Sequence, residues 1–235
     1  MKRADITSAE LPGDPPLDVA LRRSAQARRY SLRVSQLDGR VTLTMPKRAS
    51  LDEGLAFLRE KEGWIRGHLS GRPDPQRVHI GGVVPFLGQP LEVVGAQIRG
   101  PRIEEGRLLV PDDPARVAAR VQAFLKHAAR DKLAAASDKY SDQLGRKYGR
   151  LTLRDTRSRW GSCTSAGDLM YSWRLIMAPA AVLDYVAAHE VAHLQEMNHS
   201  AAFWSLVAGL CPAYQTHRTW LHQNGSSLHQ VRFGD

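Results

Sequence analysis

The segment His189-Glu190-Val191-Ala192-His193 combines residue types and a spacing that suit metal chemistry. Residues four apart on an α-helix lie on one face, about one turn from each other. His189 and His193 can therefore offer two imidazole nitrogens to one ion, while Glu190 can reach a water molecule that the ion holds. This H-E-x-x-H arrangement is typical of zinc hydrolases.

The third ligand is expected shortly after this segment, because a catalytic zinc ion usually takes three protein ligands and leaves one position open. The only acidic residues beyond Glu190 are Glu196 and Asp235, so a distant glutamate ligand is nearly excluded. His199 lies six residues after His193, a spacing that lets the chain leave the helix and turn back over the metal. We favour His199 as the third ligand and keep Glu196 as the alternative. The later histidines, His217, His222 and His229, are expected on the surface.

The elements that must position these residues follow from apolar periodicity. Apolar residues around the motif predict a buried helix over about 180–197. Burying two histidines and a glutamate there without partners would cost free energy, and a bound dication would remove that cost. We expect a strand pair at 30–34 and 41–45, one helix over about 51–69, short strands within 78–110, a long helix after Asp113-Pro114 that ends at Gly149, strands at 151–153 and 169–173, and helices at 200–210 and 214–221.

Composition is that of a globular protein. The chain has 235 residues, of which 43% are apolar and 24% charged, and no run reaches the roughly 20 apolar residues of a membrane-spanning helix. Two cysteines, Cys163 and Cys211, are too few for a disulfide framework or a four-cysteine zinc site. The first 16 residues lack the apolar core of a secretory signal. We therefore expect a cytoplasmic protein with no membrane partner.

Three regions are predicted: a flexible N-terminal arm over 1–27, a β-rich N-terminal subdomain over 28–111 and a metal-hydrolase domain over 112–235. Residues 151–235 hold six basic and six acidic residues, so the whole net charge of +9 falls in the first 150 residues. A basic half attracts anionic partners such as nucleic acid or nucleotides, although a solvated basic surface is the more common explanation.

Specific sequence pieces resemble the YgjP-like metallopeptidase domain family, whose relatives include the SprT-like proteases. The pieces are RRYSLRV (28–34), RWGSC (159–163), WRL (173–175), AP (178–179), HEVAHL (189–194), NHSAAFW (198–204) and WLHQNG (220–225). The resemblance spans about residues 28–225. It implies an α+β fold with a zincin-like core, in which a small mixed β-sheet lies over an active-site helix and a β-rich segment precedes both. It also implies Zn²⁺, or another divalent metal, on His189, His193 and His199, with Glu190 as the catalytic base.

The chemistry expected at such a site is peptide hydrolysis. Zinc lowers the pKa of a bound water towards 7, and Glu190 takes a proton from it and returns it to the leaving group. If the RWGSC segment forms a sheet edge above the cleft, Arg159 and Trp160 would bind an extended peptide there, although Trp160 could equally belong to the core. Arg174, Tyr214 or Arg218 would stabilise the oxyanion.

Two other functions stay open at this point. One is a metal-dependent pyrophosphatase acting on nucleoside triphosphates such as UTP, an activity suggested within this family, with arginines holding the phosphates. The other is a nucleic-acid-associated protease that binds through its basic N-terminal half, although no known nucleic-acid-binding motif is present. A purely structural metal is disfavoured, because closed four-ligand sites have no use for Glu190.

Overall fold

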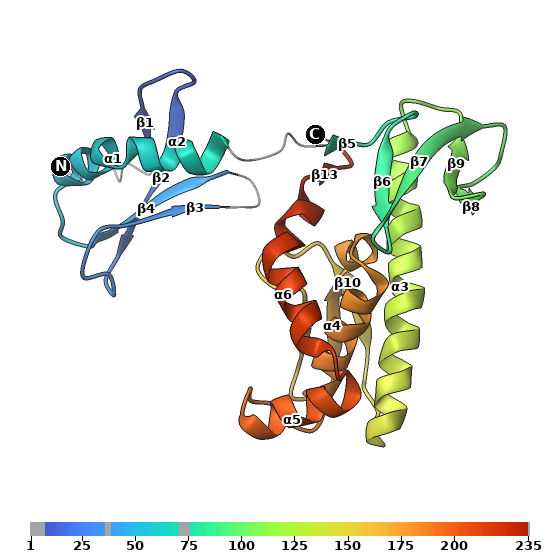
Figure 1. The fold of residues 1–235 in the computed structure, drawn as a ribbon. Helices are drawn as coiled ribbons and strands as arrows, with labels where there is room; N and C mark the ends of the chain where they lie inside the picture. The colour runs from blue at the N-terminus through green and yellow to red at the C-terminus, as the bar shows by residue number, and fades with distance from the viewer. Residues whose placement is uncertain (1–7, 36–38, 71–75, 235) are drawn as a thin grey trace. The chain divides into compact units, whose positions relative to one another are not determined.

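The computed structural model describes residues 8–35, 39–70 and 76–234. By its internal contacts the chain divides into two compact units, residues 1–74 and 75–235 (Figure 1). The expected boundary near residue 111 therefore differs from the observed division. Residues 76–111 fold with the second unit, because apolar side chains of their strands are buried in one core with the long helix that follows.

The first unit is a four-stranded sheet with two helices. Its strands run in the order β1-β2-β4-β3, with β2 and β4 parallel and the outer pairs antiparallel. Alternate residues of β4 are buried against Leu58 and Ile65 of the helices. The elements are β1 (Ser8–Leu11), β2 (Leu17–Ser24), β3 (Ser31–Val34), β4 (Val41–Pro46), α1 (Leu51–Glu60) and α2 (Glu62–Ser70). The predicted single helix over 51–69 is thus interrupted at Lys61.

The segment expected to be a flexible arm contributes two of these strands, apart from residues 1–7, which lie outside the described residues. Leu11, Val19 and Leu21 are buried, which places β1 and β2 in the core of the sheet. The guanidinium of Arg66 donates to the carbonyls of Pro12 and Pro15, at 3.1 and 2.9 Å. These contacts clamp the turn between the two strands onto α2.

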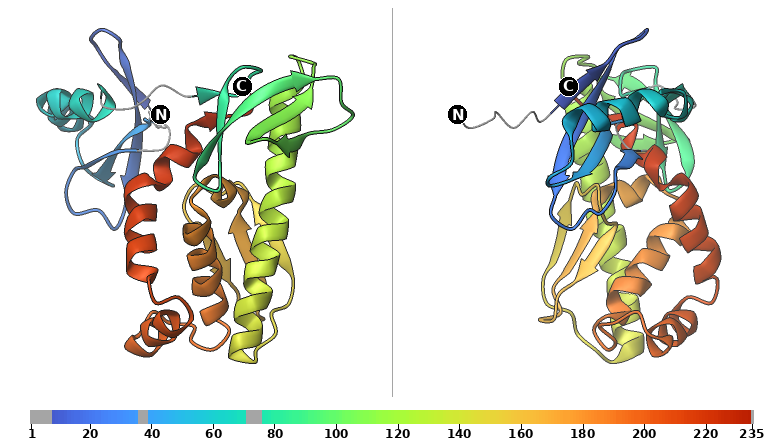
Figure 2. Two further views of the ribbon diagram at one scale, coloured as in Figure 1. Left: turned by 45° about the vertical axis from the view of Figure 1, so that its right-hand side comes forward. Right: turned by 90° about the vertical axis from the view of Figure 1, so that its left-hand side faces the viewer.

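The second unit is built around the 28-residue helix α3 (Val117–Leu144). A sheet with strand order β6-β7-β9-β8 packs on its N-terminal half through Val93, Val110 and Val121 (Figure 2). Helix α3 ends at Gly145, whose φ of 61° only glycine adopts readily, four residues before the predicted end. The strands are β5 (Gln76–Arg77), β6 (Val83–Phe86), β7 (Gln89–Ala96), β8 (Arg102–Glu104) and β9 (Arg107–Pro111).

A second sheet and a run of helices complete this unit. Strand β12 lies between β10, with which it is parallel, and β11, with which it is antiparallel. Strand β11 is therefore an edge strand. The elements are β10 (Leu151–Arg154), β11 (Gly161–Cys163), β12 (Leu169–Ser172), the 3₁₀ helix η1 (Trp173–Met177), α4 (Ala180–Ala192), α5 (Ala201–Leu210), α6 (Tyr214–Asn224), the 3₁₀ helix η2 (Gly225–His229) and β13 (Val231–Arg232).

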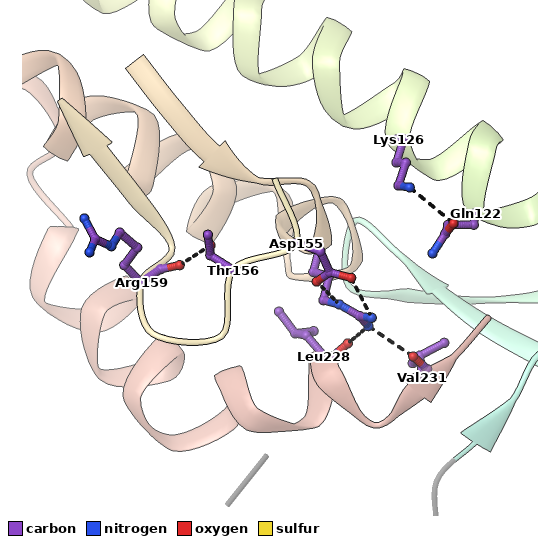
Figure 3. A network of polar contacts seen from close by, with 8 residues as sticks. Gln122, Lys126, Asp155, Thr156, Arg159, Leu228 and Val231 are labelled. Carbon is purple, nitrogen blue, oxygen red and sulfur yellow. Dashed lines mark hydrogen bonds and ion pairs between the residues drawn. The ribbon is translucent and has the colours of Figure 1, made fainter. Parts of the chain in front are cut away.

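Arg174 joins three parts of this unit. Its guanidinium pairs with Asp155 through two hydrogen bonds of 2.7 and 3.2 Å and donates to the carbonyls of Leu228 and Val231 at 2.8 and 3.0 Å (Figure 3). The Arg174 side chain is only 10% exposed. Because all three nitrogens of its guanidinium donate hydrogen bonds, Arg174 ties η1 to the segment after β10 and to the C-terminal residues.

Replacing Asp155 by Asn should destabilise the second unit in a pH-dependent way. Burial alone would raise the pKa of Asp155, but the hydrogen bonds and charge of Arg174 outweigh burial and lower that pKa. A lowered folded-state pKa stabilises the fold above the unfolded pKa of about 3.9, and this stabilisation is lost as pH falls through the folded value. We expect Asp155→Asn to cost about 2 kcal/mol at pH 5–7 and progressively less below pH 4.

Urea unfolding followed by circular dichroism at pH 7, 5 and 3.5 measures this difference. Asp131→Asn is the matched control, because Asp131 lies on the surface of α3 with a side chain 65% exposed. A cost for Asp155→Asn that is equal at all three pH values would contradict the ion-pair explanation.

Candidate metal centre

Helix α4 carries the first two histidines and the glutamate. The helix is apolar around most of its circumference, so it is buried in the unit and packs against α3, α5, α6 and β11. Glu190 and His193 are only 6% and 8% exposed. Tyr185, His189 and His193 follow one another at intervals of four residues, which places them along one face of the helix.

The chain leaves α4 earlier than the sequence predicts. The helix was expected to continue to Met197, but it ends at Ala192, and His193 occupies the C-cap. Nδ1 of His193 lies 2.9 Å from the carbonyl oxygen of Glu196, to which it can donate. This hydrogen bond fixes the imidazole and leaves Nε2 free as a ligand atom. The early exit brings His199 back to the helix, just before Ser200 caps α5 through a hydrogen bond from the Phe203 amide.

The three histidines meet at one point. Their potential ligand atoms all lie within 4.8 Å of one another, and Nε2 of His189 is 3.1 Å from Nε2 of His199. Two nitrogens bound tetrahedrally to zinc at about 2.05 Å are about 3.3 Å apart, so this spacing fits one such ion. Within the described ranges, neither Glu196 nor any other histidine, cysteine, aspartate or glutamate joins this group.

The electrostatic environment keeps two of these imidazoles neutral. Burial, with the neighbouring His193, His199 and Arg218, lowers the pKa of His189 to about 3. Burial also lowers the pKa of His193, against the opposing effect of its hydrogen bond to Glu196. Neutral imidazoles present lone pairs, and a site of neutral nitrogen donors suits a transition-metal dication. The residues present therefore fit a metal ion of the zinc type.

Glu190 lies against the edge strand β11. A Cβ added to Gly161 would lie 2.5, 2.6 and 2.7 Å from Oε1, Cγ and Cδ of Glu190, so only glycine allows this approach. Burial raises the pKa of Glu190 to about 8, and the charge of Arg159 opposes this increase. A bound dication would favour the carboxylate further, as any nearby positive charge does.

Aromatic rings pack against the histidines. The ring of Phe203 stacks on His193, with centroids 4.5 Å apart and planes inclined by 24°. The indole of Trp204 stacks on His199 at 5.7 Å and 22°, and Tyr214 stacks on the same indole at 5.4 Å and 20°. His199 is exposed, so Trp204 supplies the packing that the helix supplies to the other two ligands.

The four residues predicted to bind substrate lie in different environments. Arg159 is exposed, and its charge acts on Glu190. Tyr214 belongs to the stack on Trp204. Trp160 is half-buried against Gly225, with its ring 5.2 Å from that of His229. Arg174 is occupied by the four hydrogen bonds described above, and we propose a structural role for it.

Other residues near the site were missed or misplaced by the sequence analysis. His229 was expected on the surface, but it is only 6% exposed, which corrects that prediction. The ring of His217 lies 6.5 Å from Tyr185 on α4. Phe203 and Trp204 stand in the NHSAAFW piece, and Gly161 in RWGSC, so the signal was present as a motif. What the motif did not reveal was which side chain each residue supports.

The α+β fold and the three-histidine cluster agree with the class of metal-dependent hydrolases. The family model of the YgjP-like metallopeptidase domain matches residues 28–224, and the chain belongs to this family. The α+β fold class and the zincin-like core predicted from the sequence are thereby confirmed.

Two further comparisons were made. The crystal structure of the metallopeptidase zymogen abylysin from Pyrococcus abyssi is similar at 17% identity with a TM-score of 0.36, and the match covers 39% of this chain and 93% of that chain. The search of curated proteins found no match. None of the helices in the described part of the chain combines the length and apolarity needed to cross a membrane.

Trp204→Ala should weaken metal binding because it removes the packing that orients the exposed ligand His199. We expect the dissociation constant for Zn²⁺ to rise about tenfold, as is usual when support of a ligand is lost, and Trp204→Phe to restore most of the affinity. Competition with a chromophoric chelator measures the constant. The control is Trp64→Ala, at an exposed tryptophan of the first unit. Equal affinities in wild type and Trp204→Ala would show that His199 needs no such support.

Proposed function

We propose that this protein is a zinc-dependent peptidase in which His189, His193 and His199 hold the ion and Glu190 is the general base. One observation supports the proposal above all. The nearly buried carboxylate of Glu190 is adjacent in sequence to His189, one of the three clustered histidines. It packs against the edge strand β11 at Gly161, where only glycine leaves enough space for it. A structural metal would have no use for this carboxylate, whereas hydrolysis needs a base at that position.

The proposed roles follow from the chemistry of each group. When bound, zinc would acidify a water molecule and polarise the scissile carbonyl. Glu190 accepts a proton from the attacking water and delivers it to the departing amine, so that it ends the reaction in its starting form. Its close packing against Gly161 restricts the carboxylate to the side of the site where β11 runs.

Strand β11 is the proposed binding edge for the peptide. It lies at the end of its sheet, and its three residues are only partly buried. An extended peptide can add to such an edge through main-chain hydrogen bonds, which would place its backbone beside Glu190. Arg159 lies two residues before this strand and would lie along the bound chain. The nucleotide and nucleic-acid alternatives have no comparable observation in their favour, and the nucleotide alternative becomes an outcome of the experiments below.

Glu190→Gln should abolish hydrolysis while leaving the metal in place. We expect the zinc-loaded variant to cleave casein about 100- to 10,000-fold more slowly, because the amide cannot accept the proton. Metal content should be unchanged. Glu92→Gln, on β7, is the matched control and should cleave casein like the wild type.

The same proteins should be incubated with UTP. Release of pyrophosphate that depends on Glu190, without casein cleavage, would replace the peptidase proposal by the nucleotide one.

Loss of zinc from a Glu196→Gln variant would place Glu196 among the ligands and overturn the proposed triad.

Gly161→Ala should displace Glu190 without disturbing the ligands. The added methyl group overlaps the carboxylate, so we expect kcat for casein cleavage to fall about 10- to 100-fold with unchanged zinc affinity. Gly209→Ala on α5 is the control, because nothing lies within 4 Å of its added Cβ. In a Glu190→Gln background, Gly161→Ala should add little further loss, since both changes act through one side chain. Fully multiplicative losses would show that Gly161 acts by another route.

A further inference from the structure

One face of helix α6 forms a wall beside the metal centre. Tyr214, His217 and Arg218 stand at positions i, i+3 and i+4 and so share a face of the helix. Tyr214 stacks on Trp204, His217 lies against Tyr185 of α4, and the guanidinium of Arg218 lies over Trp204. Each of the three contacts a residue that itself contacts a histidine of the triad.

Arg218 is held in a defined position by this wall. The carbon at the centre of its guanidinium lies 4.6 Å from the centroid of the Trp204 ring, and that ring stacks in turn on His199. A cation above an indole is fixed by the ring's quadrupole, while the edges of the planar guanidinium keep their N–H donors. The stack thus presents a preorganised set of donors at a fixed distance from a proposed metal ligand.

The charge of Arg218 has no acidic partner in the described part of the chain. Among the described residues no carboxylate lies within ion-pair distance of it, and the residue is exposed. The contrast is Arg174 of the same unit, whose guanidinium is matched by Asp155 and two carbonyls. The positive charge of Arg218 acts on the site: it adds to the burial that lowers the pKa of His189 and opposes the burial that raises the pKa of Tyr185.

We propose that Arg218, supported by Trp204, is a specificity residue that binds a carboxylate of the peptide substrate close to the scissile bond. This inference rests on the peptidase function proposed above. A single guanidinium fork matches one carboxylate through two parallel hydrogen bonds. A triphosphate would require several cations or a cradle of main-chain amides, and the α6 wall offers one arginine. The carboxylate comes either from an acidic side chain or from the C-terminus of the peptide.

The first experiment maps cleavage sites in a proteome-derived peptide library by mass spectrometry. Wild type should show enrichment of Asp and Glu at one position near the cleaved bond, or cleavage at a fixed distance from the C-terminus. Arg218→Glu should reverse the side-chain preference towards Lys and Arg at that same position. Arg130→Gln, at an exposed arginine of α3, is the matched control and should keep the wild-type profile.

The second experiment uses synthetic peptides based on the preferred sequence. One pair differs only by Glu or Gln at the enriched position, and a second pair has a free or an amidated C-terminus. For wild type we expect kcat/KM to be about tenfold higher for the member that carries the carboxylate, the size expected of one partly exposed charged hydrogen bond. Arg218→Gln should remove this ratio through KM, so that the two members of the pair are cleaved with equal kcat/KM. The pair that shows the effect identifies the source of the carboxylate.

The outcomes separate this inference from the function on which it rests. If wild type cleaves no peptide at all, the proposed function fails. If it cleaves peptides with no charge preference, or with a preference that survives in Arg218→Gln, only the role of Arg218 is overturned. Competitive inhibition by inorganic triphosphate that is stronger than by acidic peptides and is lost in Arg218→Gln would also overturn it, in favour of a phosphate site.

Discussion

The main physical constraint on the second unit is that two imidazoles and a carboxylate at the C-terminal end of the largely apolar helix α4 meet a third imidazole from the segment before α5. Burial of these groups is unfavourable unless each has a partner. The fold supplies some partners itself, since the Glu196 carbonyl accepts from His193 and rings stack on two of the imidazoles. Among the described residues, Nδ1 of His189 is buried without a partner. The Nε2 atoms of His189 and His199 lie 3.1 Å apart, and an ion bound there would satisfy both of these atoms.

The residues of the site differ in how far the fold encloses them. Helix α4 fixes His189 and Glu190 through core packing along its length, and Gly161 allows the strand edge to close on the carboxylate. His199 comes from the segment between two helices and is exposed, and its ring packs against those of Phe203 and Trp204. It is therefore less enclosed than the other two histidines.

Sequence patterns predicted the elements whose signal is local. The long helix α3, the strands β3 and β4 and the helix that carries the H-E-x-x-H motif all have strong apolar periodicity or capping residues. Strands β1 and β2 were missed, because prolines and aspartates around them suggested a loose chain although Leu17, Val19 and Leu21 alternate. The end of α4 at Ala192 was misjudged because no glycine, proline or asparagine marks it, and His193 occupies the C-cap. The ligand cluster was predictable from spacing, whereas the roles of Gly161, Trp204 and Arg218 depend on contacts between distant segments.

The second unit begins and ends on the same short ladder. Strand β5 opens the unit and pairs in parallel with β13 near its end, with Gln76 opposite Val231. Entry and exit of the chain are therefore neighbours in space, and the metal centre lies in a closed loop of polypeptide between them. A module of this kind can be spliced into another protein, or its ends rejoined in a new order, without stretching the backbone that carries the histidines.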